Sequence, residues 1–121
     1  MKKALIYLLV CVSSTLVILS CSKSDNGGGG GGSSLDCNTV TNKAFAADVN
    51  PIIQSRCAIA GCHAAGSTNS GGPFTNYTEI FNKRSNIRTQ VFSGRMPQGS
   101  SLTTAQKNSI ICWIDSGAPN N

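Results

Sequence analysis

Apolar positions recur at helical spacings along the chain, and no stretch of four or more residues shows the strict alternation of a strand. Ile80 and Phe81 follow Tyr77 by three and four residues, and Ile87 and Val91 lie four apart. Such spacings place side chains on one face of a helix. The pattern therefore predicts an all-α fold of short helices.

Capping residues locate the starts of the first helices. Asn50-Pro51 fits an N-cap followed by proline at the first helical position. Thr75 or Asn76 can cap the helix around Tyr77. Residues 86–92 are predicted to form a further helical segment.

The last predicted helix has signals at both of its ends. Residues Thr103 to Gln106 fit a capping box, and Ile110 and Trp113 then share an apolar face. Gly117 stands where a C-cap glycine belongs. The sequence thus predicts a capped C-terminal helix.

The first twenty residues have the character of an export signal. Lys2 and Lys3 precede an apolar run, residues 4–19, that is shorter than the roughly 20 residues of a spanning helix. The run ends in Val-Ile-Leu-Ser-Cys at residues 17–21, which resembles the lipobox of bacterial lipoproteins. That resemblance implies cleavage before Cys21 and a lipid on Cys21. A plain signal with an incidental cysteine, or a short membrane anchor, remains open.

A flexible tether is expected at residues 21–36, which include six consecutive glycines. Such a Gly/Ser-rich segment spans on the order of 20 Å as a random coil. The domain proper is then residues 37–121. We expect it to be extracytoplasmic, on the periplasmic face or the outer membrane of a bacterium with two membranes. Ser22 after the lipid cysteine favours the outer membrane by analogy.

Composition and charge exclude several function classes. The chain has 121 residues and a formal net charge of +5, and residues 37–121 hold seven Lys and Arg against three Asp and Glu. This length is too short for a Rossmann or barrel enzyme. No basic stripe is interleaved with aromatics, so we expect no nucleic-acid partner. A domain this small usually needs a disulfide, a metal or a cofactor to stabilise its core.

The candidate chemistry lies at Cys57, Cys62 and His63, which form a C-x4-C-H segment. A Cys pair followed directly by His is typical of covalent haem attachment, although the usual spacing is two residues shorter. After signal removal His63 is the sole histidine and Met96 the sole methionine. Met96 is followed by proline in a loop that contains Gly94 and Gly99.

The order of these features resembles the small class I cytochromes c: a helix, Cys-Cys-His, middle helices, a Met-Pro loop and a capped terminal helix. The resemblance covers roughly residues 44–119. It implies a small cytochrome c-like fold around one covalent haem c. Cys57 and Cys62 would attach the haem, and His63 and Met96 would be the axial ligands of its iron.

The same resemblance implies supporting roles. The Pro73 carbonyl would accept a hydrogen bond from the His63 ring, and Arg88 or Arg95 and the Trp113 indole would pair with haem propionates. Haem would also supply the core that so small a domain lacks. The residues expected to line its pocket are Phe45, Tyr77, Phe81, Ile87, Phe92, Met96, Ile110 and Trp113.

Two other uses of the cysteines remain open. Cys57 and Cys62 can form a small disulfide loop in an oxidising compartment. Alternatively, they can join His63 and either Cys37 or Cys112 in a Cys₃His zinc site. If Cys37 and Cys112 are not ligands, a disulfide between them is the default in an exported domain, pinning the N-terminal extension against the last helix.

The expected function is electron transfer rather than catalysis. With His63 and Met96 both bound, the iron has no open position for a substrate. The chain is then a monomeric carrier, tethered to a membrane by lipid, whose partners are redox proteins. The alternatives are a zinc-binding or disulfide-stapled binding module, and a haem sensor or accessory subunit in which Met96 is displaced.

Overall fold

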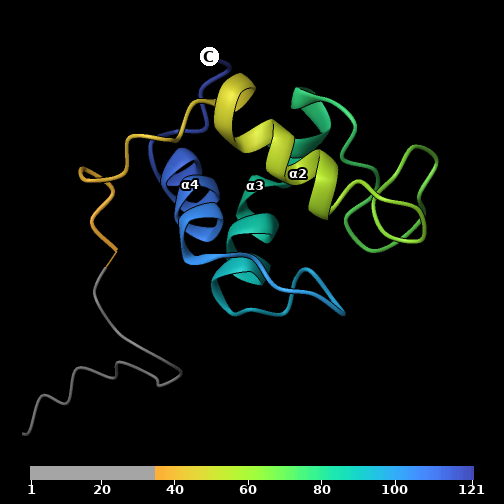
Figure 1. Ribbon diagram of the computed structural model, residues 1–121. Helices are drawn as coiled ribbons and strands as arrows, with labels where there is room; N and C mark the ends of the chain where they lie inside the picture. Colours follow the sequence, from red (N-terminus) through yellow and green to blue (C-terminus); the bar gives the residue numbers. More distant parts are fainter. Residues whose placement is uncertain (1–34) are drawn as a thin grey trace, which may run out of the picture. The chain divides into compact units, whose positions relative to one another are not determined.

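The computed structural model describes residues 35–121, which belong to one compact, all-α unit (Figure 1). No strand occurs among these residues, which confirms the prediction of an all-α fold. The elements are a π-helical turn and three α-helices: η1 (Phe45–Val49), α2 (Asn50–Arg56), α3 (Tyr77–Phe92) and α4 (Thr104–Asp115).

Several predictions fall outside this range. The signal peptide of residues 1–20, the lipidated Cys21 and most of the tether of residues 21–36 lie outside the described residues. Within residues 35–121, none of the helices combines the length and apolar character needed to cross a bilayer.

The first helix begins earlier than predicted. η1 runs directly into α2, and Asn50 has helical angles (φ −58°, ψ −45°), so Asn50 is not an N-cap. The cap comes from the far end of the chain. The Phe45 N–H donates to Asn121 Oδ1 (2.8 Å), and the Ala46 N–H donates to the Asn121 carbonyl (2.7 Å). These bonds satisfy two of the free amides that a helix start always leaves.

The capping predictions for the two long helices are confirmed. Asn76 Oδ1 accepts from the Glu79 N–H at the start of α3. Thr103 and Gln106 form both bonds of the capping box of α4, and Gly117 follows with a φ of +94°. One expectation is corrected, because residues 77–92 form one continuous helix rather than two segments.

The core lies where η1, α3 and α4 meet. Phe45 is 5.0 Å from Tyr77 and 5.3 Å from Trp113 between ring centroids. The Trp113 indole N–H donates to the Pro119 carbonyl, and the Tyr77 hydroxyl to the Ala118 carbonyl, each at 2.9 Å. The buried apolar residues around these rings are Val49, Ile53, Phe74, Ile80, Ile87, Val91, Ile110 and Ile111. The helices therefore carry an apolar core of their own.

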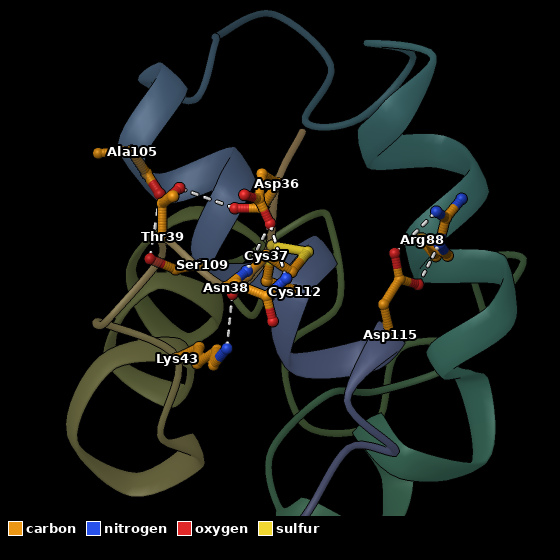
Figure 2. The surroundings of a disulfide bond; sticks show 10 residues. All are labelled: Asp36, Cys37, Asn38, Thr39, Lys43, Arg88, Ala105, Ser109, Cys112 and Asp115. Carbon is orange, nitrogen blue, oxygen red and sulfur yellow. Dashed lines mark hydrogen bonds and ion pairs between the residues drawn. A yellow bond between two sulfur atoms is a disulfide. The ribbon is translucent and has the colours of Figure 1, made fainter. Parts of the chain in front are cut away.

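The expected disulfide joins Cys37 to Cys112, across a sequence separation of 75 residues (Figure 2). Cys112 is fully buried in α4, while the Cys37 carbonyl accepts a hydrogen bond from the Lys43 ammonium group. The bond fixes the segment before η1 to the surface of α4, as the sequence predicted.

Removing this bond is expected to destabilise the fold. For the Cys37→Ser/Cys112→Ala variant we expect urea unfolding to report a loss of about 2–5 kcal/mol, because the released loop gains chain entropy. Reducing the bond in the unmodified chain separates the crosslink from the lost Cys112 packing. Equal unfolding midpoints before and after reduction would contradict the prediction.

Candidate functional site

One cavity of about 570 Å³ contains the two cysteines expected to attach a haem and the two residues expected to bind its iron: Cys57, Cys62, His63 and Met96. Its volume is within the range of about 300–1,000 Å³ usual for small-molecule sites. The loop between α2 and α3 forms one side, α3 another, and the loop after α3 a third (Figure 1). The other lining residues are Arg56, Gly61, Asn69, Ser70, Gly71, Phe74, Lys83, Asn86, Ile87, Gln90, Val91, Pro97 and Gln98.

His63 is held in a defined orientation at the cavity. Its side chain is 8% exposed, and its Nδ1 lies 2.8 Å from the Gly72 carbonyl oxygen. Because a carbonyl only accepts hydrogen bonds, Nδ1 carries a proton in this contact, and in the neutral imidazole Nε2 then holds the lone pair. A neutral imidazole of this tautomer is the form that binds a metal ion through Nε2.

The bond to His63 corrects one prediction. The accepting carbonyl belongs to Gly72 rather than to Pro73, one residue further along. The cause is the backbone at Gly71 (φ +111°) and Gly72 (φ +76°), where two successive left-handed residues turn the chain sharply. That turn directs the Gly72 carbonyl at the ring.

The Phe74 ring stacks on one face of the His63 imidazole. The two rings stack with centroids 4.2 Å apart and planes 22° from parallel. The Phe74 N–H also donates to the His63 carbonyl at 2.9 Å. The ring is therefore fixed by stacking and by a hydrogen bond at Nδ1, which leaves it little rotational freedom.

The longer spacing between the cysteines is absorbed by a closed loop. The His63 N–H donates to the Cys57 carbonyl (3.0 Å), and the Cys62 N–H donates to the Ile59 carbonyl (3.0 Å). Ile59, in the middle of the loop, is 44% exposed. The additional residues thus reach the surface, while Cys57 and His63 remain joined by a backbone hydrogen bond.

Both cavity cysteines are free thiols. Burial, with a smaller effect of the neighbouring Cys62, raises the pKa of the Cys57 thiol to about 11. Cys57 is therefore protonated at neutral pH. The structure thus differs from the alternative in which these two cysteines form a disulfide loop.

The zinc alternative lacks its fourth ligand. It required a thiolate from Cys37 or Cys112, and both sulfurs are used in their mutual disulfide. Within residues 35–121, no group of three or more His, Cys, Asp or Glu residues is arranged to hold a metal ion.

Met96 reaches the cavity from the loop after α3. The N–H groups of Arg95 and Met96 both donate to the Gln90 carbonyl, at 3.0 and 3.2 Å. These bonds fold the loop back onto the last turn of α3. They bring the half-buried Met96 to the cavity that His63 also lines.

Three predicted supporting residues lie elsewhere. Trp113 is fully buried in the core and its indole is bonded to Pro119. Arg88 forms a two-bond ion pair with Asp115, which lowers the pKa of that carboxyl group. Arg95 is exposed and outside the cavity lining. None of these three side chains faces the cavity.

The expected pocket lining is also only partly right. Ile87 and Met96 line the cavity. The others do not, because they pack into the core or face solvent: Phe45, Tyr77, Phe81, Phe92, Ile110 and Trp113.

Sequence reasoning missed the cationic lining residues Arg56 and Lys83. A signal was available, because Lys83, Ile87, Gln90 and Val91 fall at positions i, i+4, i+7 and i+8 of one helix. That spacing is a single helical stripe. Dividing α3 into two segments hid it.

Comparisons with known proteins found no match for this chain among protein-family models, curated proteins or solved structures.

Replacing Gly71 tests how the turn orients His63. In Gly71→Ala a Cβ would lie 3.5 Å from His63 Cε1, an ordinary contact, but the φ of +111° disfavours alanine. We expect a loss of about 1–2 kcal/mol in urea unfolding and shifted His63 ring signals in NMR spectra. Gly66→Ala is the control, since its φ is also positive (+76°) but no atom lies within 4 Å. It should lose stability without moving the ring signals; equal ring shifts in both variants would contradict the role of Gly71.

Proposed function

We propose that this protein is an electron carrier with one covalently bound c-type haem in the cavity. The observation that supports it is the convergence of Cys57, Cys62, His63 and Met96 on one cavity. These residues come from two loops on either side of α3, more than thirty positions apart in the sequence. A disulfide loop or a zinc site would leave Met96 at this place without a role.

The residues present fit such a group. The cavity has apolar walls at Phe74, Ile87 and Val91, which suit the flat apolar face of a macrocycle. Two free thiols stand near a histidine whose Nε2 is unbonded. Haem supplies a one-electron change at its iron, and Cys57 and Cys62 would hold it covalently.

The ligand pair decides the kind of chemistry. His63 and Met96 would fill both axial positions, so no site on the iron would remain for a substrate. The Gly72 carbonyl accepts a hydrogen bond from His63 Nδ1 and so fixes the orientation of the imidazole. This arrangement suits reversible electron transfer better than catalysis at the metal.

Charge at the cavity suits the acidic groups of the same ligand. Arg56, at the end of α2, and Lys83, in α3, both line the cavity, and no Asp or Glu does. These two cations, rather than Arg88, Arg95 or Trp113, would hold the propionates.

The proposal includes a location and a class of partner. The Cys37–Cys112 disulfide supports an oxidising compartment. The lipobox-like segment ending at Cys21 supports a lipid anchor, with the domain held near a membrane by its tether. The partners would be other redox proteins, and the carrier itself a monomer.

The direct test is the colour of the mature protein. Expressed in a bacterium that attaches c-type haem, the full chain should be red. Its α-band should sharpen on reduction, and the pigment should resist acidic solvent extraction. Cys57→Ala/Cys62→Ala is the control and should release the pigment or carry none. A colourless, fully processed protein would overturn the proposal.

Methionine ligation is tested by Met96→Ala. Loss of the thioether should open one axial position, lower the reduction potential and let carbon monoxide bind the reduced protein. Gln98→Ala, a change at another lining residue of the same loop, should leave the spectrum and potential intact. If the unmodified protein already binds carbon monoxide readily, Met96 is not a ligand and the sensor alternative is favoured.

A further inference from the structure

The Asn69 side chain hydrogen-bonds to two cavity-lining residues of the loop between α2 and α3. Its side-chain Nδ2 donates to the Gly61 carbonyl (3.0 Å) and to the Cys62 carbonyl (2.8 Å). Its own carbonyl accepts from the Gly72 N–H at 2.7 Å. Because both side-chain partners are carbonyls, the amide nitrogen must be the atom that faces them.

These contacts close a ring of hydrogen bonds around the candidate ligand. From His63 Nδ1 the ring passes to the Gly72 carbonyl (2.8 Å), from the Gly72 N–H to Asn69, and from the Asn69 side chain back to Cys62. Cys62 precedes His63 in the chain, so the ring is complete. Asn69 is the residue that joins its two halves.

A second donor reinforces the same point. The Ser67 hydroxyl also donates to the Cys62 carbonyl, and the Asn69 N–H donates to the Ser67 hydroxyl oxygen (3.2 Å). The Cys62 carbonyl therefore accepts two side-chain donors. The small, polar segment of residues 64–70 has few apolar side chains to pack, so these bonds are its main constraint.

We infer that Asn69 is a positioning residue, which acts through Cys62 and Gly72 to hold the His63 ring in its orientation. The inference rests on the proposed function as far as haem is concerned. Without the side-chain bonds of Asn69, the turn carrying the Gly72 carbonyl would no longer be fixed to the Cys62 end of the loop. The hydrogen bond to His63 Nδ1 would then weaken, and the ring would no longer be held in one orientation.

The test compares three variants of the full chain. Asn69→Leu keeps the approximate size of the side chain without a donor, and Asn69→Ala removes it. Thr68→Ala is the matched control at the preceding residue, which is exposed and outside the cavity lining. The first measurement is hydrogen exchange at the His63 and Phe74 amides. The second is the reduction potential of the haem-loaded protein.

Exchange at both amides should quicken about tenfold in the two Asn69 variants, roughly the effect of one lost hydrogen bond. The potential should change, because the bond between His63 and the iron depends on the orientation of the ring. Thr68→Ala should change neither quantity.

Each other outcome is decisive. Unchanged exchange in the Asn69 variants overturns the inference whether or not haem is present. Faster exchange with an unchanged potential also overturns it, since Asn69 would then stabilise the loop without orienting the ligand. If the protein carries no haem, the proposed function fails. Faster exchange in the Asn69 variants would still show that the Asn69 hydrogen bonds hold the loop around His63.

Discussion

The hydrogen bond between His63 Nδ1 and the Gly72 carbonyl is the interaction on which the cavity depends. The imidazole is buried, and this bond offsets the free-energy cost of removing Nδ1 from water. Nε2 takes no part in the bond. The Phe74 ring and the Asn69 bonds then fix the loop around it. Without this bond, neither the tautomer nor the direction of the free lone pair would be defined.

Helix α3 links this loop to the rest of the fold because one of its faces packs in the core and another lines the cavity. Ile80 is fully buried in the core, while Lys83 and Gln90 line the cavity. Ile87 and Val91 belong to both sets. The cavity therefore shares a wall with the core, and its shape depends on the packing of α3 against α4. The disulfide joins the segment before η1 to α4, and neither of its cysteines lines the cavity.

Local signals in the sequence predicted the elements well. Asn76, the Thr103–Gln106 box and Gly117 each act within one turn of helix, so their effect does not depend on distant residues. The Cys37–Cys112 pairing was also predicted, on the expectation that the domain is exported and that such domains rarely keep a free pair of thiols.

The predictions that failed depended on contacts that a local sequence pattern does not reveal. Asn121 caps η1 from the other end of the sequence, which no pattern near Phe45 reveals. Trp113 was expected at the cavity from the resemblance, yet the chain after α4 folds back and the Pro119 carbonyl accepts a hydrogen bond from the indole N–H. The carbonyl predicted to contact His63 was that of Pro73, one residue after the Gly72 carbonyl that does so. The backbone angles of Gly71 and Gly72 decide which carbonyl points at the ring.

The positive charge at the cavity favours ligands with acidic groups over cations. Arg56 and Lys83 line the cavity without a carboxylate among the lining residues, and a protonated Cys57 adds no negative charge. A bound cation would add to the repulsion between these groups, whereas a ligand with acidic substituents would relieve it. Apolar walls at Phe74, Ile87 and Val91 require that the rest of such a ligand be apolar. The proposed haem, a flat apolar macrocycle with carboxylates at its edge, would meet both requirements.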